Sequence, residues 1–244
     1  MIDLLAAEWM KLRTTRLLHG TLPAAVALSA AAVAGVVVST DGTEALESTD
    51  GIRRALSVTG SGAIVVLVAG IVLSAGEYRH GTAADTFLTT PHRSRVVAAK
   101  LAVGAGLGLV VGALTSLAAV AVASLLYAVD DASFPLGDGE VWATLAGTLA
   151  YTTLFAVLGV ALGTLARNQV VAVAGALAWI AIVEHILVNL APDIGRWLPA
   201  AAGQAILRTP LDNLLSPLTA TAVLASYAAM FTLAGVRAAV TRDA

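Results

Sequence analysis

The chain has 244 residues, of which 58% are hydrophobic and 12% are charged, with a mean hydropathy of +0.87. Soluble domains carry about 25% charged residues, so this composition excludes an ordinary water-soluble domain and indicates a membrane protein. The sequence contains no cysteine, which excludes disulfides, thiol nucleophiles and thiolate metal sites. The net charge of −2 identifies no partner, and we expect the lipid membrane, not nucleic acid, to surround the chain.

Long apolar runs set the fold class. A bilayer core of about 30 Å requires about 20 apolar residues per helix, and several such runs occur here. They are continuous and rich in Ala, Leu, Val and Gly, without the alternation of outer-membrane strands. We therefore predict a single all-α polytopic transmembrane domain over residues 1–244. Its six spans are predicted at about 22–39, 55–75, 96–129, 141–166, 170–190 and 217–236.

The first 20 residues precede the first span. Ile2, Leu5, Trp9 and Leu12 recur at helical spacing, and the basic residues Lys11 and Arg13 lie away from that stripe. An apolar face with Trp and with basic residues near its end predicts an amphipathic helix in the membrane interface. The alternative is an ordinary extension of the first span, whose first turn would contain Pro23.

Two polar segments follow the first and fifth spans. Residues 40–54 hold four acids and two arginines between Asp-Gly turns, which predicts a loop outside the hydrocarbon. Residues 191–216 are interrupted by Pro192, Pro199 and Pro210, and their apolar runs are too short to cross a bilayer. This pattern predicts broken or re-entrant helices at the outer surface before the sixth span.

Glycines recur every four residues in the third and fourth spans. This spacing forms a ridge on which another helix can approach closely, although glycine is common in membrane helices generally. The predicted packing positions are Gly104, Gly108 and Gly112 in the third span and Gly159 and Gly163 in the fourth.

The basic residues predict the orientation. With six spans both termini lie on one side, together with residues 76–95 and the tight turn at Arg167. That side holds ten of the 14 bases: Lys11, Arg13, Arg16, Arg79, Arg93, Arg95, Lys100, Arg167, Arg237 and Arg242. Positive residues mark the cytoplasm, so we expect both termini to be cytoplasmic. Two lysines against twelve arginines, with much alanine, are typical of a GC-rich bacterial genome, so we expect the membrane to be a bacterial plasma membrane.

Motifs for catalysis are missing from the sequence. There is no GxxxxGK[ST] phosphate loop, no HExxH and no GxSxG. The histidines lack the spacing of metal ligands, so we expect no metal site and no enzyme activity in the chain itself.

Glu184 and His185 are ionisable residues within the fifth span. Such residues are functional candidates, because an unpaired charge in a bilayer is costly. One interpretation places them on a translocation path or gate. In the other, Glu184 reaches the outer interface or pairs with Arg196.

Residues 76–95, GEYRHGTAADTFLTTPHRSR, are the polar segment between the second and third spans. Thr82 and Asp85 fit a capping box, and Pro91 ends the segment, which predicts a two-turn helix over 83–89. That helix would present Phe87 and Leu88 to a groove on another protein. The alternative is a surface loop whose basic residues contact lipid headgroups.

The chain resembles the ABC-2 type (type V exporter-like) permeases of bacteria, especially small actinobacterial ones. The resemblance is carried by EWMKLRTTR before the first span, by the E-x-R-x-G-T pattern in GEYRHGT and by TTPHRSRVVAAK leading into the third span. It covers the whole chain. The turn at Arg167 departs from the family pattern, because it leaves little room for a second coupling element.

The resemblance implies an ATP-driven exporter whose energy comes from a separate subunit. Two cytoplasmic ATPase subunits would bind ATP and Mg, and a second permease, identical or homologous, would complete the complex. Residues 76–95 would be the coupling loop and residues 1–20 the connecting helix. The coupling-loop contacts implied are Glu77, Tyr78, Arg79, Gly81, Thr82, Asp85, Phe87 and Leu88.

The implied cargo is hydrophobic or amphipathic, such as a drug, lipid or peptide. Two other functions stay open from the residues alone. One is a secondary transporter, which more often carries buried charges in broken central helices and an internal repeat. The other is a non-transporting membrane sensor or immunity protein.

Overall fold

The computed structural model describes residues 2–15, 17–81 and 93–241, whose regular elements are all helices, with no strand among them. Six helical stretches in this part of the chain are long and apolar enough to cross a membrane, which confirms the predicted fold class. They are Leu17–Val38, Thr49–Arg79, Arg93–Val129, Gly139–Ala166, Gln169–Leu190 and Pro217–Ala238.

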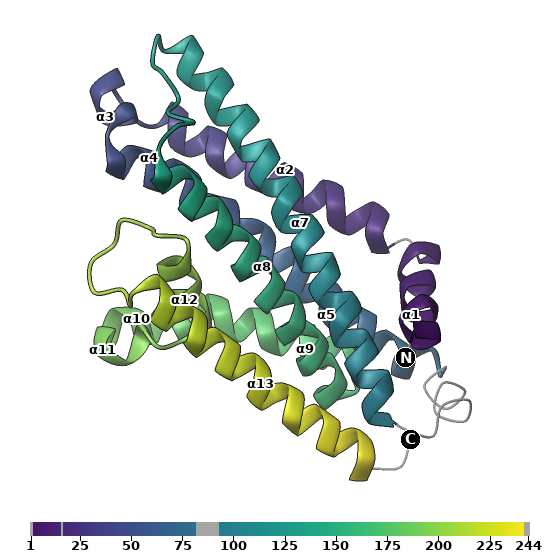
Figure 1. The fold of residues 1–244 in the computed structure, drawn as a ribbon. Coiled ribbons are helices and arrows are strands. Elements are labelled where there is room, and N and C mark those ends of the chain that lie inside the picture. Colours follow the sequence, from purple (N-terminus) through teal and green to yellow (C-terminus); the bar gives the residue numbers. More distant parts are fainter. Residues whose placement is uncertain (1, 16, 82–92, 242–244) are drawn as a thin grey trace.

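The helices run in a bundle with two distinct ends (Figure 1). We call the end that carries both chain termini and the α8–α9 turn the terminal end, and the opposite one the distal end. The long helices are α2 (Leu17–Val38), α5 (Gly62–His80), α7 (Arg93–Val129), α8 (Gly139–Ala166), α9 (Gln169–Ala178) and α13 (Pro217–Thr241). At the terminal end α1 (Ile2–Thr14) packs across the bundle, against α7 and α2.

The distal end is built from short helices. They are α3 (Thr43–Glu47), α4 (Thr49–Ser57), the 3₁₀ turn η1 (Val58–Ser61), α10 (His185–Leu190), α11 (Pro192–Gly195) and α12 (Pro199–Ile206). A π-helical stretch, η2 (Trp179–Glu184), connects α9 to α10. The broken helices predicted before the last span are therefore present as α11 and α12, each with proline in its first turn.

Residues 40–54 are not the loop that the sequence predicts. They form α3 and the start of α4, and the Ser48 hydroxyl caps α4 by accepting from the Gly51 N–H at 3.0 Å. The turn signals were misleading because Leu46, Ile52 and Leu56 are buried and attach these helices to the bundle. Tertiary packing of an apolar face thus outweighs local turn preference.

Two other boundaries differ from the prediction. The helix of the first span starts at Leu17, so Pro23 lies inside α2 and not in its first turn. The helix of the second span continues to His80, five residues beyond the predicted end of that span at residue 75. Gly81 then ends α5 in the left-handed conformation, φ 73°, with its N–H bonded to the Glu77 carbonyl. Glycine suits this position because it carries no Cβ.

Close helix contacts centre on α8. A Cβ added to Gly108 of α7 would lie 2.6 Å from the Thr153 Cα of α8. One added to Gly163 of α8 would lie 2.7 Å from the Ile71 carbonyl oxygen of α5. Gly104 and Gly112 face α8 in the same way, and Gly159 faces α5. The two glycine ridges therefore lie on contacts within this chain, on the faces where α7, α8 and α5 approach most closely.

Candidate functional site

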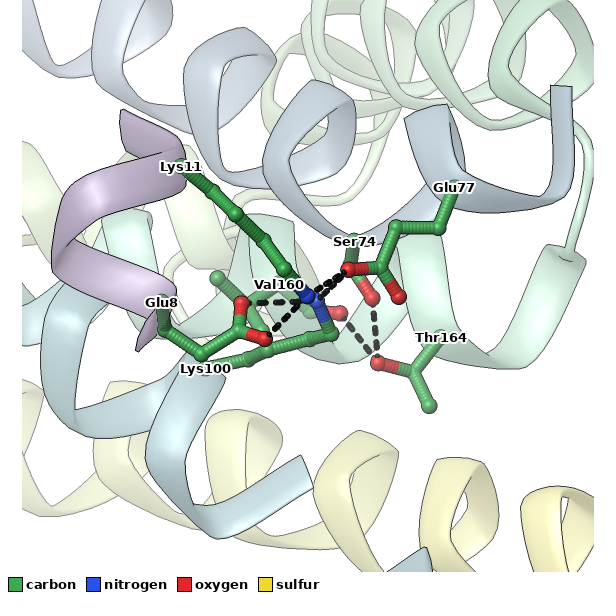
Figure 2. A network of polar contacts seen from close by, with 7 residues as sticks. All are labelled: Glu8, Lys11, Ser74, Glu77, Lys100, Val160 and Thr164. Carbon is green, nitrogen blue, oxygen red and sulfur yellow. Dashed lines mark hydrogen bonds and ion pairs between the residues drawn. The ribbon is translucent and has the colours of Figure 1, made fainter. Parts of the chain in front are cut away.

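Four charged side chains from three helices form a closed ring at the terminal end of the bundle (Figure 2). Lys11 Nζ lies 2.8 Å from Glu8 Oε1 and 2.7 Å from Glu77 Oε1. Lys100 Nζ lies 2.8 Å from Glu8 Oε2 and 2.6 Å from Glu77 Oε1. Charges alternate around the ring, so the four groups together are neutral.

The positions follow from the local structure of each helix. Glu8 and Lys11 are one turn apart on α1, where Leu12 is buried beneath them. Glu77 is in the last turn of α5, and Lys100 is two turns into α7. We name the set Glu8, Lys11, Glu77 and Lys100 the ion-pair ring. It joins α1, α5 and α7 at the point where α5 ends.

Most of the ion-pair ring is shielded from solvent. The Glu8 and Lys100 side chains are 1% and 6% exposed, and Glu77 is 12% exposed. Lys11 forms the outer edge at 41%. Burial lowers the pKa of Lys11, but its hydrogen bonds to Glu77 and Glu8 outweigh that effect and raise the pKa above its usual value. Lys11 is therefore charged at neutral pH.

Lys11 and Lys100 offset the cost of placing the Glu77 carboxylate at the end of α5. A helix carries partial negative charge at its C-terminus, so a carboxylate in the last turn of α5 is unfavourable by itself. Two ammonium groups on one oxygen of Glu77 offset both this dipole and the desolvation of the carboxylate. Removing either partner of a buried pair leaves an uncompensated charge, which is strongly destabilising.

A pair of hydroxyls joins two helices of the bundle core close to the ring (Figure 2). The Ser74 and Thr164 hydroxyls lie 2.7 Å apart, one turn below Glu77, and join α5 to α8. The Thr164 hydroxyl also lies 2.8 Å from the Val160 carbonyl of its own helix, to which it can donate. Only one of these contacts uses the Thr164 proton at a time.

The α8–α9 turn also contacts this end of the bundle. Arg167 has a positive φ of 52°, and its guanidinium donates to the Ala238 carbonyl of α13 at 2.6 Å. The same guanidinium lies over the ring of Tyr78, 5.4 Å from its centroid. Tyr78, near the end of α5, therefore contacts the α8–α9 turn of the same chain.

The predicted coupling-loop residues fall into four groups. Glu77 and Tyr78 face other helices of this chain, and Arg79 is exposed. Gly81 caps α5. Thr82, Asp85, Phe87 and Leu88 lie outside the described residues, as does the two-turn helix predicted there.

The apolar stripe predicted for the N-terminal segment lies on α1, and its place in the membrane interface stays a prediction. Only its Leu12 is fully buried, whereas Ile2 is 82% and Trp9 is 44% exposed. The face on the bundle is formed by Leu12 and Glu8, because Glu8 meets Lys100 there. Arg13 is exposed, and Lys11 belongs to the ion-pair ring instead of the free polar face.

Glu184 neither reaches the outer surface nor pairs with Arg196, the two alternatives to a role on a translocation path or gate. It is 2% exposed, so it does not reach the surface of the bundle, and Arg196 lies near Asp193 instead, at 3.8 Å. Its Oε2 accepts from the Ala200 N–H at 2.7 Å. His185 next to it is exposed.

Sequence reasoning missed the ion-pair ring and treated Glu184 as the exceptional ionisable residue within the spans. Lys100, inside α7, is buried as well. A signal existed: lysine occurs at only two positions among 14 bases, and both are in the ring. The i,i+3 spacing of Glu8 and Lys11 was a second one. No local sequence pattern indicated that residues 8, 77 and 100 would lie in contact.

Comparison with known proteins identifies the family. The family model described as "ABC-2 family transporter protein" matches residues 4–183, about three quarters of the chain. A search of curated proteins gave no significant match. Among the described residues, no cluster of His, Asp or Glu could hold a metal ion. The chain therefore belongs to the ABC-2 transporter family and is a membrane permease of an ABC transporter.

Proposed function

We propose that the chain is the membrane subunit of an ATP-driven exporter for hydrophobic or amphipathic compounds. Two permeases, identical or homologous, pair with two cytoplasmic ATPase subunits that bind ATP and Mg. The observation that carries the proposal is the ion-pair ring. It joins α1 to the two helices, α5 and α7, between which residues 82–92 connect.

In this proposal the ring transmits force. An ATPase subunit presses on residues 82–92 and on α1 when it binds ATP. Because α1, α5 and α7 are held by four short ion pairs, they move together. The movement reaches the core through the Ser74–Thr164 contact and through the glycine-mediated packing of α8 against α5 and α7. Glu77 thus acts inside the permease, and Arg79 is the exposed residue beside the ATPase.

The orientation rests on the distribution of charge. The terminal end carries the exposed bases Arg13, Arg79 and Arg95, and basic residues favour the cytoplasmic side. Because the chain has no cysteine, a single cysteine reports one position. A membrane-impermeant maleimide should label Glu44→Cys on α3 in intact cells. It should label Arg79→Cys only after the cells are permeabilised, and the reverse pattern would overturn the orientation.

The partner is tested by purification. The tagged permease, taken from native membranes in mild detergent, should retain a subunit with a GxxxxGK[ST] motif, identified by mass spectrometry. In that complex Glu77→Gln should lower the ATP hydrolysis rate toward that of the isolated ATPase. Glu44→Gln at the distal end is the matched control. An unchanged rate in Glu77→Gln would refute a role of the ring in coupling, and absence of any ATPase would refute the exporter.

A further inference from the structure

An apolar cavity of about 320 Å³ follows α9 and η2 along the bundle. It falls within the range of about 300–1,000 Å³ that small-molecule sites occupy. Its walls come from α5, α8, η2 and α13 and include Leu67, Leu158, Trp179, Tyr227 and Phe231. A lining of aliphatic side chains and three aromatic rings suits an apolar body of modest size.

Glu184 is the charged group that lines this cavity. One carboxylate oxygen accepts from the Ala200 N–H, at the start of α12. The other, Oε1, is buried and has no hydrogen-bond partner. Leaving a buried acceptor unpaired costs about 1–3 kcal/mol, and more for a charged group. The Trp179 side chain and the Ala201 N–H also lie close to this carboxylate, but neither makes a hydrogen bond of good geometry to Oε1.

Burial disfavours the Glu184 carboxylate as an anion, and the surroundings supply only partial positive charge to offset this. The first N–H groups of α12 carry partial positive charge, which stabilises an anion at that helix end. No ion pair to Glu184 occurs among the described residues, since Arg196 is held near Asp193. A cap for α12 explains one oxygen of Glu184 and leaves the other unexplained.

Glu184 also lines a second cavity of about 460 Å³ toward the distal end. The walls of this second cavity are more polar and include Ser57, Ser61, His185, Gln204 and Thr209. Glu184 thus lies between a largely apolar cavity and one whose lining holds more polar side chains. That is a suitable place to orient an amphiphile, with its charged group at the polar side.

We propose that Glu184 and the apolar cavity form a binding site for a lipophilic amine in its protonated form. The ammonium N–H donates to Oε1 of Glu184, and Trp179 and Tyr227 add cation–π attraction. The apolar body fills the space beside Leu67, Leu158 and Phe231. This inference narrows the cargo class of the proposed exporter and so rests on that function. The site itself is tested on the permease alone.

The probe is tritiated 6-phenylhexylamine, bound at pH 7 to the permease in lipid nanodiscs, with empty nanodiscs subtracted. The uncharged 6-phenylhexan-1-ol is the matched probe of the same shape. Charge-assisted hydrogen bonds contribute about 1.5–3 kcal/mol, so the amine should bind at least about tenfold more tightly than the alcohol. Glu184→Gln keeps an oxygen for Ala200 but turns an amide toward the amine. It should abolish the preference, whereas Glu44→Gln should retain it.

A second variant tests the cavity independently of the charge. Ala176 lines the cavity and is partly buried, so Ala176→Phe should fill it and weaken both probes. Alcohol binding retained by Glu184→Gln reports that this variant is folded. Equal affinity of wild type for amine and alcohol, or no saturable binding, would overturn the proposal even if Glu184→Gln does not fold. Because no ATPase is present, either result leaves the coupling proposal to its own test.

Discussion

Replacing Lys100 by Met should destabilise the permease by about 3 kcal/mol. Methionine retains most of the apolar stem but removes the ammonium that contacts Glu8 and Glu77. Removing one partner of a buried ion pair costs about 3–5 kcal/mol. We place Lys100→Met at the lower end, because Lys11 still contacts both carboxylates.

Because charges alternate around the ring, the stability of Lys100→Met can be compared with that of a double variant that restores charge balance. Lys100→Met leaves two carboxylates and one ammonium, whereas the double variant Glu8→Gln/Lys100→Met leaves a neutral Lys11–Glu77 pair. The double variant should therefore be more stable than Lys100→Met by at least about 1 kcal/mol, because neighbouring substitutions are not additive. Arg95→Met is the matched control, an exposed base on the same helix that should change stability by less than about 0.5 kcal/mol.

The assay is reversible unfolding in mixed dodecylmaltoside and SDS micelles, followed by tryptophan fluorescence. Two results would refute the reasoning. One is a Lys100→Met variant as stable as Arg95→Met, which would mean that the ring contributes no net stability. The other is a double variant no more stable than Lys100→Met, which would mean that charge balance is not what the ring supplies.

Three further outcomes are expected in the same unfolding assay. Gly108→Leu should cost about 1–3 kcal/mol, because its Cβ would meet the α8 backbone, whereas Gly106→Leu on the same helix points into open space and should cost little; equal costs would contradict the packing described. Tyr127→Phe should cost about 1–2 kcal/mol, because the buried hydroxyl donates to the Leu46 carbonyl at 2.8 Å, and no loss would mean that water replaces it. Lys11→Met should be less stable than wild type at neutral pH; since the pKa of Lys11 is raised in the folded state, the difference should persist up to about pH 10.5 and shrink only above it, and a difference that shrinks by pH 9 would contradict this.

The sequence predicted the features that depend on composition. A run of about 20 apolar residues has few alternatives to a membrane helix, so all six spans could be located. Proline in the first turn of α11 and α12 likewise fixed where the broken helices begin. These are local properties, which a single sequence displays directly.

Features that depend on tertiary contact were not predictable in the same way. Residues 40–54 contain turn signals, yet Leu46 and Ile52 are buried in a hydrophobic core and most of the segment is helical. Glu8 and Lys100 are 92 residues apart and meet only because α1 folds onto α7. The contact of Glu184 with the Ala200 N–H likewise depends on where α12 packs, which no local pattern shows.

The most direct test of the central claim is a cross-link from Arg79→Cys to the ATPase subunit. A photoactivatable maleimide is attached to this single cysteine in the purified complex, and Glu44→Cys at the distal end is the control. We expect an adduct between the permease and a GxxxxGK[ST]-containing subunit from Arg79→Cys alone. No adduct from Arg79→Cys, or an equal adduct from Glu44→Cys, would contradict the assignment of the terminal end as the ATPase contact.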